Sequence, residues 1–244
     1  MQISFLLLLA LALLRAASAR VLRDQIIGGR KVTPHSKPWM ALITFSLEGR
    51  SWHCGGFLVK EDFVMTAAHC NGTDMKVHLG VHDVKEDKST WQIFDVKKFY
   101  PGHYKPDTKE NDIQLLQLHG RARLSKTVQL IPLPKSGSVV PVNSLCNVAG
   151  WGNSPVLQAV DVEVISNHEC SKALDVKEGS ITETMMCAGI GKEDKDASQG
   201  DSGGPLVCDG VAEGIVCCGP RHHPPGIYTR ISKFMLWVQK VIEH

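Results

Sequence analysis

Gly200-Asp201-Ser202-Gly203-Gly204-Pro205 is the stretch from which the fold and the chemistry of this chain can be worked out. It sets one serine among glycines, which adopt backbone conformations closed to other residues and leave the neighbouring amide groups open to an approaching molecule. The pattern therefore predicts a serine hydroxyl that is presented as a nucleophile. Taken alone, an ordinary turn serine would have the same sequence.

Two further short motifs supply the groups that a serine nucleophile needs. Thr66-Ala67-Ala68-His69-Cys70 offers an imidazole base, and Asn111-Asp112-Ile113-Gln114-Leu115-Leu116 offers a carboxylate that would orient the imidazole. Singly, His69 is more typical of a core or surface histidine, and Asp112 of a turn residue before a strand. Their occurrence with Ser202, in the order His, Asp, Ser, favours one catalytic group.

The beginning of the chain predicts entry into the secretory pathway. An apolar run at residues 5–14 is followed by Ala17-Ser18-Ala19, so residues 1–19 are expected to be a signal peptide. The run is too short to span a bilayer, and no later stretch reaches about 20 apolar residues, so no membrane span is expected. In an oxidising compartment, the eight cysteines are expected to form disulfides.

Charge and cysteine spacing argue against two classes of function. The 27 basic and 25 acidic residues give a net charge of +2. A cut before Ile26 would leave a neutral chain, because it removes three basic residues and one acidic residue: Arg15, Arg20, Arg23 and Asp24. Neutrality gives no support for nucleic-acid binding. No Cys-x-x-Cys pair occurs, and neither a metal nor a cofactor is predicted.

Most of the chain reads as short β-segments separated by turns, which favours antiparallel barrels or sandwiches over parallel sheets. The expected strands lie at 56–59, 63–67, 76–80, 91–96, 113–118, 147–150, 160–165, 205–207 and 211–216. Near the end, apolar residues three and four apart from Phe234 to Ile242 predict a helix with Ser232 as its N-cap. The proline-bearing stretch 131–141 is the expected connector between two halves.

Together these motifs resemble the chymotrypsin-like serine proteases, and most closely the granzyme and mast-cell protease group. Besides the three motifs above, the resemblance rests on Ile26-Ile27-Gly28-Gly29, Pro34-His35-Ser36-Lys37-Pro38-Trp39-Met40-Ala41, Val148-Ala149-Gly150-Trp151-Gly152 and Pro225-Gly226-Ile227-Tyr228-Thr229. It implies a peptidase domain at 26–244 with an all-β fold: two antiparallel six-stranded Greek-key β-barrels, at about 26–130 and about 131–230, and a C-terminal α-helix at about 232–243.

The resemblance also implies an activity. The protein would be a secreted or granule-stored serine endopeptidase that hydrolyses protein or peptide substrates through an acyl-enzyme. His69, Asp112 and Ser202 would be the catalytic triad, and the backbone amides of Gly200 and Ser202 the oxyanion hole. Serpin-type inhibitors and granule proteoglycan are further partners that the group suggests. A low-activity homologue that acts as a binding protein, and a protease restricted to a chosen partner, are the alternatives.

The substrate pocket is where this sequence departs from the family pattern. Asp196 stands where trypsin-like members carry the acid that selects Arg or Lys, with Gly219 and Gly226 keeping the pocket open. A chymase-like preference, with Asp196 in a solvated loop, is the alternative. Cys217 and Cys218 replace a serine that bonds the catalytic aspartate and an aromatic residue. Free thiols are favoured there over a vicinal disulfide or a link to another chain.

Activation is expected to follow a cut before Ile26, whose new ammonium would pair with Asp201. Residues 20–25 would be the propeptide. Gln25 argues against a trypsin-like activator and Asp24-Gln25 suits a dipeptidyl peptidase, but a signal cut after residue 19 leaves six residues, so the route stays open.

The chain also carries residues for covalent modification and cross-linking. Asn71-Gly72-Thr73 is a candidate glycosylation site. The disulfides that the resemblance implies are Cys54–Cys70, Cys146–Cys208 and Cys170–Cys187.

Overall fold

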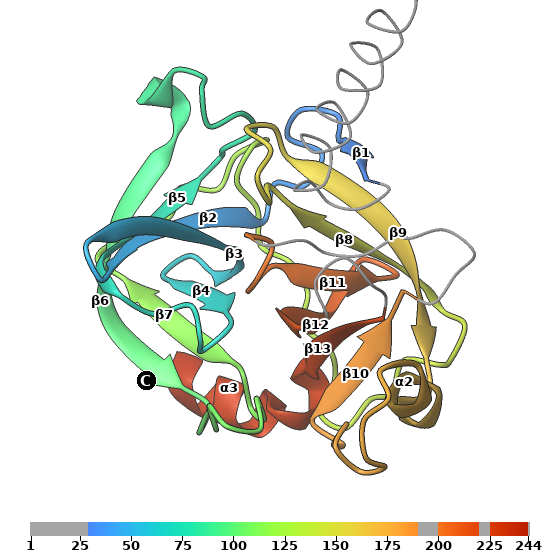
Figure 1. Ribbon diagram of the computed structural model, residues 1–244. Coiled ribbons are helices and arrows are strands. Elements are labelled where there is room, and N and C mark those ends of the chain that lie inside the picture. Colours follow the sequence, from blue (N-terminus) through green and yellow to red (C-terminus); the bar gives the residue numbers. More distant parts are fainter. Residues whose placement is uncertain (1–28, 190–199, 220–224, 244) are drawn as a thin grey trace, which may run out of the picture.

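The computed structural model describes residues 29–189, 200–219 and 225–243 (Figure 1). The expected signal peptide, the expected propeptide, Ile26 and Asp196 lie outside the described residues. Within the described part, no helix has the length and apolar character needed to cross a bilayer.

The first half of the described chain forms a closed barrel of six strands. The strands are paired antiparallel in the order β2-β3-β4-β7-β6-β5. Their bounds are β2 Met40–Leu47, β3 Arg50–Lys60, β4 Phe63–Thr66, β5 Thr73–Leu79, β6 Gln92–Pro101 and β7 Gln114–Leu118. A short 3₁₀ helix, η2 (Lys88–Thr90), precedes β6. Closure leaves this barrel without a free edge and fills its interior with apolar side chains, among them Phe57, Met65 and Leu115.

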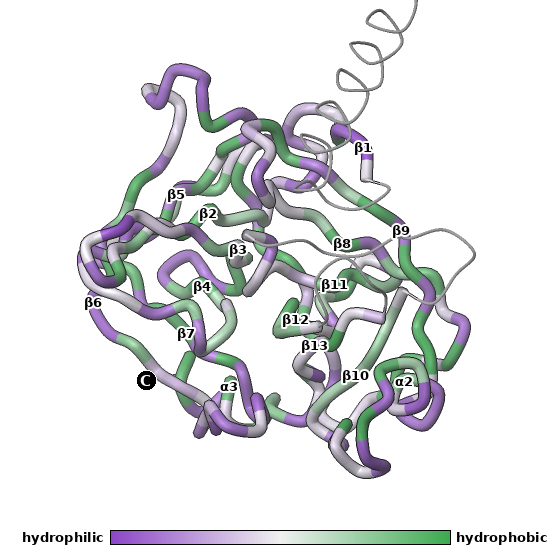
Figure 2. Tube along the Cα trace, viewed as in Figure 1, coloured by the Kyte–Doolittle hydropathy of each residue, from purple (hydrophilic) through white to green (hydrophobic). Residues whose placement is uncertain are grey.

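The second half forms another antiparallel barrel, which is closed where β9 pairs with both β8 and β10. The strand order is β1-β9-β10-β13-β12-β11-β8, with β1 added outside on β9. The bounds are β1 Arg30–Lys31, β8 Leu145–Gly150, β9 Gln158–Ile165, β10 Met185–Ala188, β11 Pro205–Cys208, β12 Val211–Cys218 and β13 Gly226–Arg230. Figure 2 shows hydrophobic residues along β11 and β12 and hydrophilic residues in the outer connections.

The structure confirms the predicted fold class, two six-stranded antiparallel barrels with a C-terminal helix. Strand β9 follows its alternation, since Val160, Val162 and Val164 are buried whereas Asp161 and Glu163 are exposed. Strands β1, β2, β10 and β13 were not predicted. Most residues of β2 and all four of β10 are buried, so they carry no polar alternation to mark them.

The two helices differ from expectation. Helix α2 (Asn167–Ala173) was missed, although Ser166 and Glu169 form a capping box at its start. The C-terminal helix α3 spans Met235–Ile242 after a 3₁₀ turn, η3 (Ile231–Lys233), and its N-cap is Phe234. Ser232 as N-cap is therefore wrong: its hydroxyl donates instead to Ser138 O at 2.7 Å.

His78 links the stability of the first barrel to pH. It is buried in β5, shares a hydrogen bond of 2.9 Å between its Nε2 and Thr44 Oγ1, and meets the Trp91 ring edge-on. Burial, and then the positive charges of Lys88 and Lys76, lower the pKa of His78 to about 4. The unfolded chain therefore takes up this proton first as the pH falls, which destabilises the fold between about 6.5 and 4.

We expect His78→Gln to flatten this part of the pH profile, because glutamine does not titrate there and still reaches Thr44. Urea unfolding at pH 7 and pH 4.5 should show a smaller loss of unfolding free energy in the variant than in the parent. The exposed His119→Gln is the matched control and should lose as much unfolding free energy between the two pH values as the parent does. Equal losses in all three proteins would show that His78 is not the cause of the pH dependence.

Candidate active site

His69 and Asp112 meet because two neighbouring strands of the first barrel place them there. Strand β4 pairs with β7 through Thr66 and Gln114, so the segment after β4 lies beside the residue that precedes β7. Asp112 is completely buried. Its Oδ1 accepts from the backbone amide of His69 at 2.8 Å and its Oδ2 from the ring Nδ1 at 2.6 Å. These two bonds fix the tautomer and the direction of the ring, so that Nε2 is the free end of the imidazole.

The segment that carries this pair is itself clamped. Gln114 Nε2 donates to Ala67 O at 3.0 Å and to Cys70 O at 2.8 Å, which ties both sides of the His69 turn to β7. Thr229 Oγ1 of β13 donates to Asp112 O at 2.9 Å, so the second barrel also holds the aspartate. The side chain of His69 is about a third exposed, and a molecule outside can reach it.

Ser202 comes from the second barrel, on the turn before β11, and its backbone is joined to the first. Gly55 of β3 donates its amide to Ser202 O at 2.8 Å. Gly203, at φ +82°, lies so close to the first barrel that a Cβ there would collide with Gly55 O and Thr66 Oγ1. Only glycine fits this position, which explains why the serine is followed by one.

The residue two places before Ser202 is equally confined. Gly200 has φ +94°, and a Cβ on it would lie 2.6 Å from His53 Nε2 and 2.8 Å from Gly152 O. His53 itself donates from Nε2 to Gly152 O at 2.8 Å. His53 was missed in the sequence because a histidine beside Cys54 in a strand carries no motif. The structure makes it the link between β3 and the backbone around Gly200.

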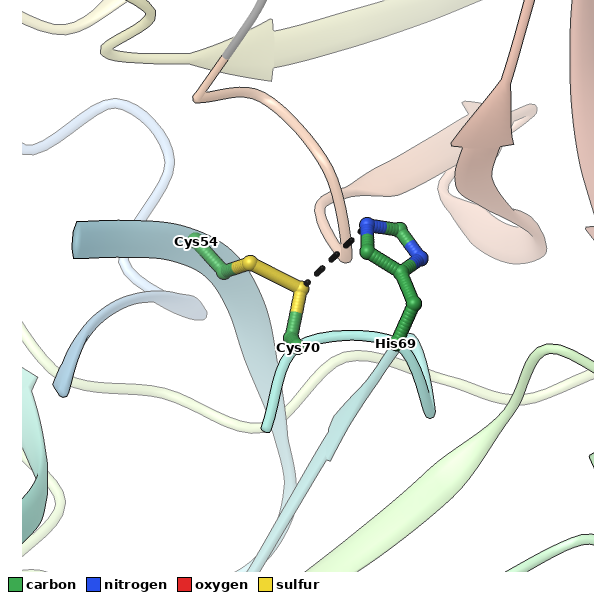
Figure 3. A group of neighbouring side chains, drawn as sticks. All are labelled: Cys54, His69 and Cys70. Carbon is green, nitrogen blue, oxygen red and sulfur yellow. Dashed lines mark hydrogen bonds between the residues drawn. A yellow bond between two sulfur atoms is a disulfide. The ribbon is translucent and has the colours of Figure 1, made fainter. Parts of the chain in front are cut away.

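Three disulfides hold the elements around the site: Cys54–Cys70, Cys146–Cys208 and Cys170–Cys187. These are the pairs that the resemblance implied. The first joins β3 to the His69 turn, and Figure 3 shows the ring beside it, with Cys70 Sγ 3.8 Å from His69 Nε2. Cys54, His69 and Cys70 are close enough to share a metal, but both sulfurs are bonded to each other and are not thiolates.

Asp201 and the two remaining described cysteines are further predicted site residues in the second barrel. Asp201 is completely buried, with its carboxylate against Gly150, where a side chain would not fit. Cys217 is buried and Cys218 partly exposed at the end of β12, and neither is in a disulfide. The next residue, Gly219, faces Gly226: a Cβ on Gly219 would lie 3.5 Å from Gly226 Cα.

The family model described as Trypsin matches residues 26–238 of this chain. The chain belongs to the trypsin family. It is 44% identical to Mast cell protease 3 of Ovis aries, covering 97% of this chain and 96% of that protein. It is 40% identical to Granzyme B of Homo sapiens, with 98% of each chain covered. The solved structure titled "Structure of GrC" superposes with a TM-score of 0.84 at 37% identity, covering 90% of this chain and 100% of the other.

These matches make the protein a serine endopeptidase of the trypsin family, related to the granzymes and mast-cell proteases. Within the described residues, His69 and Asp112 are hydrogen-bonded, and Ser202, Gly200, Cys217 and Gly219 come from segments of the second barrel.

Gly203→Ala should destabilise this trypsin-family fold more than the same substitution does at a glycine that has a positive φ but no close neighbours. Gly210 is the matched control, because it has φ +76° but nothing within 4 Å of a Cβ. The added methyl group at Gly203 would push on the backbone of the other barrel, so we expect a loss of unfolding free energy at least about 1 kcal/mol larger than for Gly210→Ala. Urea unfolding measures both, and equal losses would contradict a tight contact between the barrels.

Proposed function

We propose that this protein is a secreted or granule-stored endopeptidase that cleaves peptide bonds through a Ser202–His69–Asp112 triad and an acyl-enzyme. The carrying observation is the pair of hydrogen bonds from His69 to the buried Asp112, with Ser202 tied to the same barrel by Gly55. The family supports hydrolysis of protein or peptide substrates. Serpin-type inhibitors, granule proteoglycan and a glycan on Asn71 are further parts of the proposal.

The proposed cycle uses His69 twice. Its Nε2 takes the proton of Ser202 Oγ as the oxygen attacks the peptide carbonyl, and then gives that proton to the leaving amine. Asp112 keeps the proton on Nδ1 and stabilises the imidazolium that forms. A water molecule, deprotonated in the same way, then attacks the acyl-enzyme and releases Ser202.

Two backbone amides are assigned to the oxyanion. The amides of Gly203 and Gly204 are engaged with Val216 O and Asp201 O, at 2.8 and 2.9 Å. We assign the amides of Gly200 and Ser202 to the developing charge on the resemblance to the serine proteases, and the engagement of the two following amides is consistent with this assignment. In related hydrolases, removing one such donor costs about 3–4 kcal/mol of transition-state stabilisation.

Activation is proposed to begin with a cut before Ile26. Its ammonium would then pair with Asp201 and order the segment that carries Gly200. The complete burial of Asp201 supports this step, since a buried carboxylate is stable when it is paired with a charge.

A fluorophosphonate probe tests the triad directly. Protein that begins at Ile26 should be labelled on Ser202, because only an activated serine attacks the phosphorus centre. Ser202→Ala should take up no label, and His69→Ala should react far more slowly. The absence of label from the processed protein would overturn the proposed mechanism and favour the second candidate, a low-activity homologue that acts as a binding protein.

The pocket is proposed to select Arg or Lys through Asp196, with a chymase-like preference as the alternative. The close approach of Gly219 and Gly226 supports a pocket whose walls stay open. We expect cleavage after Arg or Lys to exceed cleavage after Phe or Leu. Asp196→Asn should lower kcat/KM for the basic substrates by about a hundredfold, because the charge pair is lost. A peptide library measures both, and a parental preference for Phe or Leu would contradict this assignment.

His53 is proposed to position Gly200 through Gly152. His53→Phe keeps a ring but loses the Nε2 donor, so kcat should fall by about tenfold, the effect of one hydrogen bond, with a smaller change in KM. His53→Gln, which can still donate, should recover part of that loss. Affinity for a peptide aldehyde, whose adduct carries the oxyanion, should follow kcat. A loss confined to KM, or equal losses in both variants, would show that His53 does not act on the oxyanion site.

A further inference from the structure

Cys217 and Cys218 place two sulfur atoms in contact at the end of β12. Neighbouring side chains of a regular strand point to opposite faces. Here the pairing of β12 with β13 shifts register between Val216 and Cys218, so that Cys217 lies in a bulge. The two Sγ atoms are 2.6 Å apart, although neither cysteine is in a disulfide. The backbone therefore already holds the pair close to bonding distance, which is about 2.05 Å.

The buried member of the pair also contacts the loop before Asp112. A hydrogen bond with Cys218, burial and the charge of Asp112 all raise the pKa of Cys217, so its thiol keeps its proton at neutral pH. Cys217 Sγ donates to Lys109 O at 3.9 Å, on the loop before Asp112. The Cys217 thiol thus joins the end of β12 to the loop that leads into Asp112.

We propose that Cys217 and Cys218 are a reversible dithiol–disulfide site, and that its closure removes the thiol that contacts Lys109 O, on the loop that leads into Asp112. The covalent step stands on the geometry of the two cysteines alone. Its effect on catalysis rests on the proposed function of Asp112 as a member of the triad.

The step balances with a low-molecular-weight disulfide, such as glutathione disulfide, as the oxidant. Cys218, which is partly exposed, attacks one sulfur of that disulfide; an S–S bond to Cys218 forms and one glutathione leaves. Cys217 then attacks Cys218 Sγ, and the second glutathione leaves. Two protein thiols are oxidised, one glutathione disulfide is reduced to two thiols, and the two thiol protons end on the glutathione sulfurs.

Chain geometry makes the closed form easy to reduce. Adjacent residues have Cα atoms about 3.8 Å apart, whereas the Cα atoms of disulfides are usually about 4.4–6.8 Å apart. The ring is therefore strained, and strained disulfides have the more oxidising potentials typical of regulatory sites. The other three disulfides join residues 16, 62 and 17 positions apart in the sequence, so none of them closes such a small ring.

The test equilibrates the processed protein in glutathione buffers, from fully reduced to fully oxidised, and blocks thiols with an alkylating reagent. Mass analysis of the peptide with Cys217 and Cys218 should show two alkylated thiols at the reducing end and, at the oxidising end, an unalkylated peptide lighter by two hydrogens. The kcat should fall over the same range, by up to about tenfold, the loss expected for one hydrogen bond.

Two variants separate the pair from the structural disulfides. Cys218→Ser keeps the Cys217 thiol but cannot close the ring, and the double variant Cys217→Ser with Cys218→Ser cannot react at all. The kcat of each should be insensitive to the buffer, whatever its own value. A peptide that keeps both thiols throughout, or stays closed throughout, overturns the reversible site. A closing ring with constant kcat overturns its effect on Asp112.

The mass readout needs no enzymatic activity, so failure of the proposed function would not hide the covalent step. In an inactive protein, the effect on Asp112 is read from the NMR signal of the His69 Nδ1 proton, which should shift when the ring closes.

Discussion

The close approach of the two barrels at Gly55, Gly203 and Gly204 is the constraint on which the site depends. A Cβ on Gly55 would lie 3.0 Å from Gly204 Cα, and one on Gly203 would collide with the first barrel. At this distance the backbone of Ser202 can accept from the amide of Gly55. The proposed nucleophile, Ser202, is thereby fixed relative to the barrel that carries the proposed base, His69, through direct contacts between the two backbones.

Each barrel then contributes what its own strands can hold rigidly. The first supplies His69 and Asp112 from the adjoining ends of β4 and β7, where Gln114 and the Cys54–Cys70 disulfide restrict the turn. The second supplies Ser202 and Gly200, and Gly200 packs directly against the hydrogen bond between His53 and Gly152 O. Hydrogen bonds cross the interface in both directions, from Thr229 to Asp112 O and from His53 to Gly152 O. The contacts between the barrels therefore hold the candidate active site in place.

The fold class and the pairing of His69 with Asp112 could be predicted from the sequence because both leave local marks, whereas the triad as a whole stays a prediction. Alternation marks β9, and glycines that are required by close contact mark the Ser202 turn. Fully buried strands such as β10 leave no such mark, and neither does His53, whose role arises from a partner that is distant in the sequence. Ser232 was taken for a helix cap because capping needs only a local hydroxyl, whereas the fold uses it to bind Ser138. The roles of Ile26 and Asp196 stay predictions, since both lie outside the described residues.

A crystal structure of the protein beginning at Ile26, after reaction with a peptide phosphonate, would test the proposed active site most directly. We expect the phosphorus to be bonded to Ser202 Oγ and the phosphonyl oxygen to accept hydrogen bonds from the amides of Gly200 and Ser202. His69 Nε2 should lie within about 3 Å of the adduct. A Ser202 that stays unmodified, or an adduct oxygen that points away from both amides, would contradict the assembly of one active site from the two barrels.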